Sequence, residues 1–179
     1  MRIVLVLLTL LASVASHAQV VTLSLDDMRA HSAFRVPSIV MEPTIKSGEF
    51  VYVDVKGFQA ADLKVGNIIA FRQRLPVNQL TVKRVIALPG STVQFRRWKL
   101  YVDNKEAIEP YVHPDNVMNT DSFEWGPVTV KAGCVFVLSD NRDIGNDSRK
   151  NGCVVFEDIL GVAKFVATES APQAARRLP

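Results

Sequence analysis

The chain has 179 residues, of which 48% are hydrophobic and 22% charged, and this balance excludes a disordered or collagen-like protein. The length suits one domain that can bury a hydrophobic core. Its 21 Lys and Arg residues against 18 Asp and Glu leave a net charge of only +3, which predicts no nucleic-acid partner.

The N-terminus predicts an export segment. A charged Arg2 precedes an apolar run, and the next charged residue is Asp26. Small residues up to Ala18 suit cleavage by a leader peptidase, so residues 1–18 are expected to be a signal peptide. The alternative is a membrane anchor that extends to residue 25, since a helix of that length can span the hydrocarbon layer. Both alternatives export the folded part, either to the periplasm or as a membrane-anchored domain that faces the extracytoplasmic side.

The body of the chain predicts a mostly β domain with minor helix. Short runs of β-branched and aromatic residues alternate with turn signals, a pattern typical of strands. These runs occupy residues 50–55, 68–72, 80–88, 92–95, 100–102, 128–130, 134–138 and 160–167. Residues 25–33 carry the best short helix signal, and the alanine-rich residues 169–179 are expected to be a flexible tail.

Two cysteines begin predicted strands. Because export places the domain in an oxidising compartment, Cys134 and Cys153 could form an intrachain disulfide that closes a loop of roughly 20 residues. Two separate buried thiols are the alternative. Neither the cysteines nor the three histidines have the spacing of metal ligands, so no metal and no cofactor are expected.

Two segments contain more than ordinary strands and turns. Residues 36–48 hold two prolines and small hydroxyl residues, which suits an extended, rigid loop that lines a groove. Residues 81–90 place Lys83 and Arg84 in an apolar strand, where alternation sends them to opposite faces. A buried Lys83 would have a lowered pKa and could act as a general base. The alternative is an edge-strand lysine in solvent.

A third segment, residues 139–149, is a polar loop that follows an apolar strand directly. Its charged and amide side chains can cross-link the loop, for example through Asp147 and Arg149. Composition alone leaves open whether this loop is a structural support or a binding site.

In this order, the three segments resemble the type I signal peptidase family, membrane-associated serine endopeptidases that use a Ser/Lys dyad. The residues that match the family motifs are Pro37, Ser38, Met41, Pro43, Thr44, Gly48, Lys83, Arg84, Ala87, Leu88, Pro89 and Gly90, followed by most of residues 139–149. The resemblance implies an elongated, mostly antiparallel β domain over residues 34–168. It also implies a nearby membrane surface and an extended peptide or preprotein as the substrate.

The resemblance assigns roles to individual positions. Lys83 falls on the general base, Ser38 on the oxyanion site and Val40 on the nucleophile. The groove for the substrate is expected at Val36, Pro37, Met41 and Val82. Support of the site is expected from Asp140, Asn141, Arg142, Gly145, Asp147, Ser148 and Arg149.

Two departures from the family pattern lie beside the lysine. Val40 has no oxygen to attack a carbonyl, so the usual acyl-enzyme cannot form there. The family's serine that orients the lysine falls on Gly145, and the leading glycine of the same segment is Ser139. Lys83 has therefore lost both hydroxyl neighbours of the family pattern, and little or no peptidase activity is expected.

Two functions follow from this pattern. The first is a catalytically impaired homologue that holds an extended exported peptide by strand addition without cutting it. The second is an active endopeptidase that processes signal peptides, or a conjugation or pilus subunit precursor, through a non-standard nucleophile such as Ser38. A self-cleaving transcriptional repressor is disfavoured by the export signal and by the lack of a DNA-binding helix pair.

Overall fold

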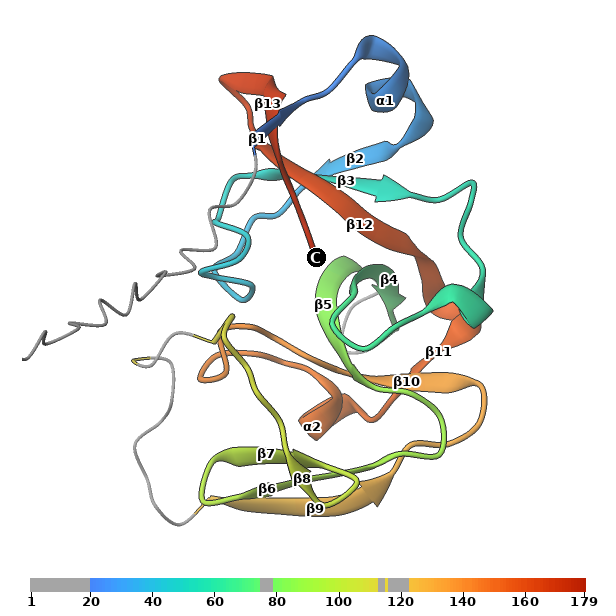
Figure 1. The fold of residues 1–179 in the computed structure, drawn as a ribbon, viewed down its shortest axis with the longest axis vertical. Helices are drawn as coiled ribbons and strands as arrows, with labels where there is room; N and C mark the ends of the chain where they lie inside the picture. Colours follow the sequence, from blue (N-terminus) through green and yellow to red (C-terminus); the bar gives the residue numbers. More distant parts are fainter. Residues whose placement is uncertain (1–19, 75–78, 113–114, 116–122) are drawn as a thin grey trace, which may run out of the picture.

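The computed structural model describes residues 20–74, 79–112, 115 and 123–179. Antiparallel strands dominate this part of the chain and form two sheets (Figure 1). The prediction of a mostly β, antiparallel fold is therefore confirmed. The predicted export segment, residues 1–18, lies outside the described residues.

The elements follow one another along the chain as short strands with brief helical turns. They are β1 (Val20–Thr22), α1 (Leu25–Ala30), β2 (Ser32–Arg35), β3 (Phe50–Asp54), η1 (Ala60–Asp62), β4 (Ile68–Gln73), β5 (Gln79–Ala87), β6 (Thr92–Arg96), β7 (Lys99–Val102), β8 (Lys105–Glu106), β9 (Glu124–Thr129), β10 (Cys134–Leu138), α2 (Ser148–Asn151), β11 (Val154–Val155), η3 (Phe156–Asp158), β12 (Ile159–Thr168) and β13 (Ala171–Arg177).

The larger sheet has the order β1-β13-β12-β4-β5-β10-β11, and β3 joins it by pairing with both β12 and β2. The smaller sheet has the order β8-β7-β6-β9 and lies at one end of the molecule (Figure 1). β5 and β10 are neighbours near the middle of the molecule, and the chain runs directly from β5 into the smaller sheet. The segments expected to carry the site therefore start from the centre of the fold.

Local sequence explains the tight turns of the smaller sheet. Arg97 and Trp98 join β6 to β7, and Asp103 and Asn104 join β7 to β8, all four with positive φ. Two consecutive positive φ angles are the signature of a type I′ turn, whose twist matches that of the flanking strands. Asp and Asn tolerate this conformation well, so residues 103–104 are suited to the turn.

The C-terminal residues differ from the expected flexible tail. β13 pairs with β12 on one side and with β1 on the other. Ala175 is fully buried, Leu178 is only 6% exposed, and the Leu178 backbone N–H donates to the Lys164 carbonyl at 2.9 Å. Alanine has a low strand propensity, but tertiary pairing and burial override that preference here.

The start of the described chain belongs to the sheet. β1 pairs with β13 over three residues, so a membrane anchor continuing to residue 25 would have to displace this strand. Within the described ranges, no helix has the length and apolar character needed to cross a bilayer.

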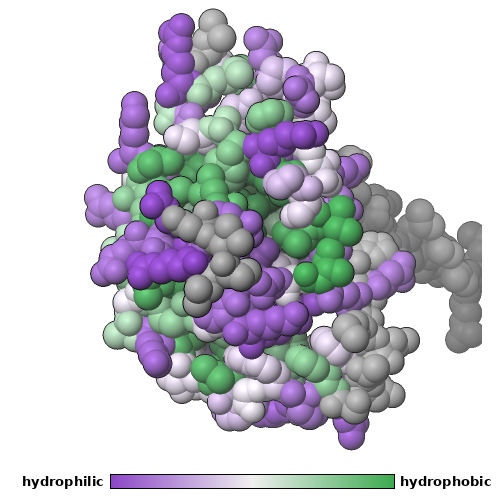
Figure 2. All heavy atoms as spheres, turned by 180° about the vertical axis from the view of Figure 1, so that it is seen from behind, coloured by the Kyte–Doolittle hydropathy of each residue, from purple (hydrophilic) through white to green (hydrophobic). Residues whose placement is uncertain are grey.

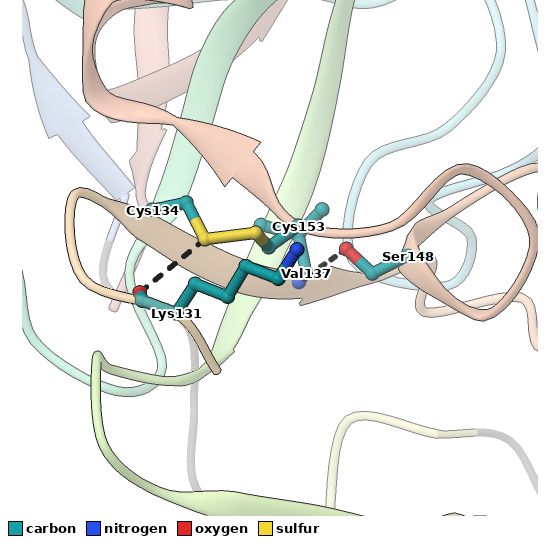
Figure 3. The surroundings of a disulfide bond; sticks show 5 residues. All are labelled: Lys131, Cys134, Val137, Ser148 and Cys153. Carbon is teal, nitrogen blue, oxygen red and sulfur yellow. Dashed lines mark hydrogen bonds between the residues drawn. A yellow bond between two sulfur atoms is a disulfide. The ribbon is translucent and has the colours of Figure 1, made fainter. Parts of the chain in front are cut away.

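The two cysteines form a disulfide in the structure, across a sequence separation of 19 residues. Cys134 opens β10, and Cys153 lies between α2 and β11 (Figure 3). The covalent loop between them contains the whole polar segment, residues 139–149. The bridge therefore restrains the segment that was expected to support the site.

Candidate active site

The three segments meet in the folded chain. The Asn141 backbone N–H donates to the Val40 carbonyl at 3.0 Å, and the Asn141 side-chain amide donates to the Ile39 carbonyl at 3.3 Å. The third segment emerges from β10, which pairs with β5 by placing Leu138 opposite Arg84. The polar loop thus binds residues 36–48 through Asn141. It also follows β10 directly, the strand that pairs with β5, which carries Lys83.

Val40 is half-buried and packs as an ordinary hydrophobic residue. It lies against a cluster of buried side chains from the loop, the larger sheet and the C-terminus. The members are Val36, Met41, Ile45, Val51, Val53, Ile68, Ala70, Val82, Ala163, Val166 and Leu178. The position that the sequence comparison assigns to the nucleophile is thereby used for apolar packing.

The expected groove residues lie mostly inside the core, which corrects the sequence-based assignment. Val36, Met41 and Val82 are 4%, 0% and 2% exposed, and only Pro37 of the four is exposed. Their side chains face the same apolar cluster as Leu178, because burying them there removes their surface from water. These three residues support the loop from within and do not line an open groove in this structure.

Lys83 lies in the interior, which excludes the solvent-exposed alternative. Its side chain is 2% exposed, and burial lowers its pKa from the ordinary 10.5 to about 8. The carboxylates of Asp147 and Asp140 partly offset this effect, whereas Arg149 adds to it. Among the residues that the structure describes, the Lys83 amine has no hydrogen-bonded partner.

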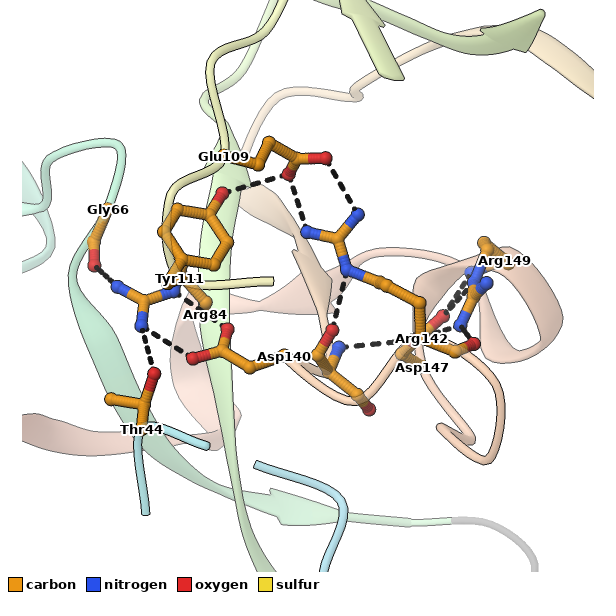
Figure 4. A network of polar contacts seen from close by, with 10 residues as sticks. Thr44, Gly66, Arg84, Glu109, Tyr111, Asp140, Arg142, Asp147 and Arg149 are labelled. Atoms are coloured by element: carbon orange, nitrogen blue, oxygen red, sulfur yellow. Dashed lines mark hydrogen bonds and ion pairs between the residues drawn. The ribbon is translucent and has the colours of Figure 1, made fainter. Parts of the chain in front are cut away.

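Arg84 points to the opposite face and links all three segments. Its guanidinium donates twice to the Asp140 carboxylate, at 2.8 and 2.6 Å, and also to Thr44 Oγ1 at 3.2 Å and the Gly66 carbonyl at 2.9 Å. The Tyr111 ring covers it at 3.9 Å (Figure 4). Both members of the ion pair are almost fully buried, so removing either one would leave the charge of the other unpaired in the interior.

The polar loop is cross-linked by two further arginines (Figure 4). Arg142 donates to both oxygens of Glu109 and to the Ser139 carbonyl. The expected contact between Asp147 and Arg149 is present as two hydrogen bonds of 2.9 Å. Such paired, charge-assisted bonds make a rigid loop.

Most of the expected supporting residues are brought together in this loop. Those that are buried with polar contacts are Asp140, Asn141, Arg142, Asp147 and Ser148, and Arg149 is partly buried beside them. Sequence reasoning gave no role to Glu109, Tyr111 or Thr44. The signal for the first two was their place in the Ile-Glu-Pro-Tyr stretch directly after the β7–β8 hairpin.

Ser38, the expected oxyanion residue, is half-buried. In the described part of the chain its hydroxyl makes no hydrogen bond, to Lys83 or to any other group. No group of three or more His, Cys, Asp or Glu side chains in the described ranges could hold a metal ion. Among the residues expected to act chemically, the structure therefore places Lys83 as a buried, poorly solvated amine and Ser38 as a half-buried hydroxyl with no hydrogen bond to it.

Comparison with known proteins agrees with the resemblance of the motifs. The model of the family described as signal peptidase, peptidase S26, matches residues 3–168. Signal peptidase IB of Staphylococcus aureus (strain COL) is 33% identical over 138 residues, which cover 70% of this chain and 71% of that protein. Signal peptidase I of Bacillus amyloliquefaciens is 38% identical over 135 residues, which cover 70% of each.

A solved structure adds a match in three dimensions. The crystal structure of a signal peptidase I from Enterococcus faecalis V583 superimposes with a TM-score of 0.51 at 30% identity, covering 57% of this chain and 97% of that one. The chain therefore belongs to the signal peptidase family, peptidase S26.

Proposed function

We propose that this chain is a catalytically impaired, signal-peptidase-I-like protein that binds extended exported peptides without cutting them. The observation that carries the proposal is Val40 at the nucleophile position. A valine cannot form an acyl-enzyme, and loss of a nucleophile removes several powers of ten of rate. The half-buried side chain of Val40 supports this, because it packs against the apolar cluster and offers no group that could react.

Substitute nucleophiles find little support. Ser38 makes no hydrogen bond to the Lys83 amine in the described structure, and a general base must reach the proton that it removes. Attack by Ser38 would also vacate the oxyanion position. An active endopeptidase using Ser38 is therefore kept only as an outcome of the experiment below.

Peptide binding by strand addition is supported by one edge of β5. β4 pairs with β5 from Gln79 to Arg84, whereas β10 pairs with it only from Arg84 onward. Over the described ranges, no strand pairs with the second edge between Leu80 and Lys83. An extended peptide can complete such an edge with main-chain hydrogen bonds. The names of the relatives point to the leader segments of preproteins as the class of peptide.

The proposed compartment is extracytoplasmic, either periplasmic or at the membrane surface. Ile39 and Ile144 are 48% and 49% exposed, next to Val40 and Gly145. On the face drawn in Figure 2, hydrophobic side chains gather in patches between hydrophilic ones. The disulfide between Cys134 and Cys153 supports an oxidising, extracytoplasmic compartment. Cell fractionation with protease accessibility of spheroplasts tests the compartment, and protection from protease in intact spheroplasts would place the chain in the cytoplasm instead.

A cleavage assay tests the catalytic part of the proposal. The purified full chain is incubated with a preprotein that carries small residues before its cleavage site, and the products are identified by mass spectrometry. The wild type should give no product and Val40→Ser should give one, which Lys83→Met in the same background should remove. Cleavage by the wild type that disappears in Ser38→Ala would overturn the proposal in favour of a non-standard nucleophile.

A binding assay tests the peptide part separately. Fluorescence anisotropy of a labelled leader peptide should report binding to the wild type. The matched control is the same peptide with alternate backbone amides N-methylated, which retains its side chains but cannot complete a strand. Equal binding of both peptides would contradict strand addition, and no binding of either would contradict a peptide-binding role.

A further inference from the structure

Gly145 is pressed against the side chain of Ser139. A Cβ atom placed on Gly145 would lie 2.2 Å from Ser139 Oγ and 2.5 Å from Ser139 Cβ, and 2.8 Å from Asp147 Oδ2. Gly145 is not among the glycines with positive φ, so space and not backbone conformation requires glycine here. Side chains at positions 139 and 145 therefore exclude each other, and the Ser139 hydroxyl occupies the volume that a serine at 145 would need.

The Ser139 hydroxyl is buried without a partner. The residue is 0% exposed, and within the described chain its Oγ is the buried side-chain atom that lacks a hydrogen bond. Its backbone, in contrast, is fully used, because its N–H donates to Asp147 Oδ2 at 3.1 Å and its carbonyl accepts from Arg142 Nε at 2.7 Å. A buried hydroxyl with no partner is unfavourable and calls for an explanation.

The pairing of β5 with β10 brings Lys83 to this hydroxyl. Val137 lies opposite Val85 and Leu138 opposite Arg84. Ser139 directly follows Leu138, the last paired residue of β10, and Lys83 directly precedes Arg84, so the two residues lie next to the end of this pairing. The buried Lys83 amine likewise makes no hydrogen bond to a described residue.

Asp147 ties the two residues together electrostatically. It accepts the Ser139 backbone N–H, and its carboxylate is the largest of the nearby charges that favour the Lys83 ammonium. The other charged groups that act on this amine are Asp140, also favourable, and Arg149, which is unfavourable. The amine, the hydroxyl and the carboxylate thus share one buried polar region.

We infer that Ser139 replaces the serine that is missing at position 145, and that its hydroxyl, which makes no hydrogen bond in this structure, is the group that engages and positions the Lys83 amine. Gly145 is the complementary change that makes room for it. The chain has therefore relocated one hydroxyl neighbour of the lysine and lost only the other, at Val40. The inference depends on the proposed function only in treating Lys83 as the general-base position, and its main test needs no catalysis.

A titration of Lys83 in the full chain provides that test. The protein is labelled with ε-13C lysine, the Lys83 signal is assigned with Lys83→Arg, and its pKa is followed by NMR. A hydrogen bond that the charged Lys83 ammonium donates to a hydroxyl is stronger than one made by the neutral amine, so the bond favours the charged form. Its loss in Ser139→Ala should therefore lower the Lys83 pKa by about one unit. The matched control is Ser148→Ala, which removes a buried hydroxyl that already accepts the Val137 N–H at 3.0 Å. That control should reduce stability and leave the Lys83 pKa in place.

The exclusion between the two positions gives a second, independent readout. Gly145→Ser alone should lower Tm sharply or prevent folding, whereas Ser139→Gly should fold and show the lowered Lys83 pKa. The double variant Ser139→Gly/Gly145→Ser should restore both Tm and the Lys83 pKa. In a Val40→Ser background, Ser139→Ala should reduce kcat by about tenfold with little change in KM, and the double variant should recover it.

An unchanged Lys83 pKa in Ser139→Ala would overturn the inference, whatever the state of the double variant. A folded double variant whose Lys83 pKa stays low would also overturn it. Failure of Val40→Ser to cut any peptide would count against the proposed function alone, because the titration is carried out without substrate.

Discussion

Replacing Lys83 by methionine should change how stability depends on pH. The pKa of Lys83 falls from 10.5 to about 8 because burial disfavours the ammonium. At 1.36 kcal/mol per pKa unit, this fall corresponds to about 3 kcal/mol of destabilisation when the folded protein must hold the charged form. Methionine has a similar length and carries no charge, so it removes this term.

The sign follows from proton uptake on unfolding. Between pH 8 and pH 10.5 the unfolded chain keeps the lysine proton while the folded chain has lost it, so the stability of the wild type rises with pH in this window. The destabilisation is complete below about pH 8 and is lost as the pH rises toward 10.5. The stability advantage of Lys83→Met should therefore be about 2–3 kcal/mol larger at pH 7 than at pH 10.

Urea unfolding followed by tryptophan fluorescence measures this difference at each pH. Only the pH-dependent part is used, so any change in packing caused by methionine cancels. Lys164→Met, which removes an exposed lysine of β12, measures the effect of losing one positive charge from the same sheet and is subtracted. A difference between Lys83→Met and wild type that stays constant from pH 7 to pH 10 would refute the assignment of Lys83 as a desolvated amine.

Three further variants, each measured by urea unfolding, test the contacts that hold the site in place. Asp140→Ala should destabilise by roughly 3–5 kcal/mol, because it leaves the Arg84 guanidinium buried and unpaired; a loss below 1 kcal/mol would mean that water reaches the pair. Replacing both Cys134 and Cys153 by alanine should remove about 3 kcal/mol through the 19-residue loop, and equal stability with and without the bridge would contradict this. Leu178→Ala should remove about 2–4 kcal/mol, whereas a neutral effect would support the flexible tail expected from the sequence.

The strands could be predicted because their signals are local. β4, β5, β10 and β12 consist of β-branched and aromatic runs between turn residues, and they occur close to where this pattern predicts them. β13 could not be predicted in this way, since its alanine-rich sequence has a weak strand signal. It becomes a strand only because β12 and β1 flank it and because Leu178 is buried beyond its end.

The burial of the site residues depends on contacts between distant segments. Alternation along β5 separates Lys83 from Arg84 but does not say which face is covered. Both faces are covered here, and Arg84 is held by Asp140, which lies 56 residues further along the chain. Met41 was expected in a groove for a similar reason, because the local sequence does not say which distant segments cover it. An apolar residue in a proline-containing loop suits either place, and only the packing of the C-terminus decides between them.

Position-by-position comparison with a family pattern treats each departure as a separate loss. On that basis, Val40 and Gly145 count as two losses beside one lysine. The folded chain relates Gly145 to Ser139, six residues away in sequence, through a contact too close for two side chains. On the proposed role of Ser139, a glycine-to-serine change at one position and a serine-to-glycine change at the other form a single compensated exchange. Val40 has no such counterpart, because its side chain packs against hydrocarbon, and the proposed loss of activity therefore depends on this position.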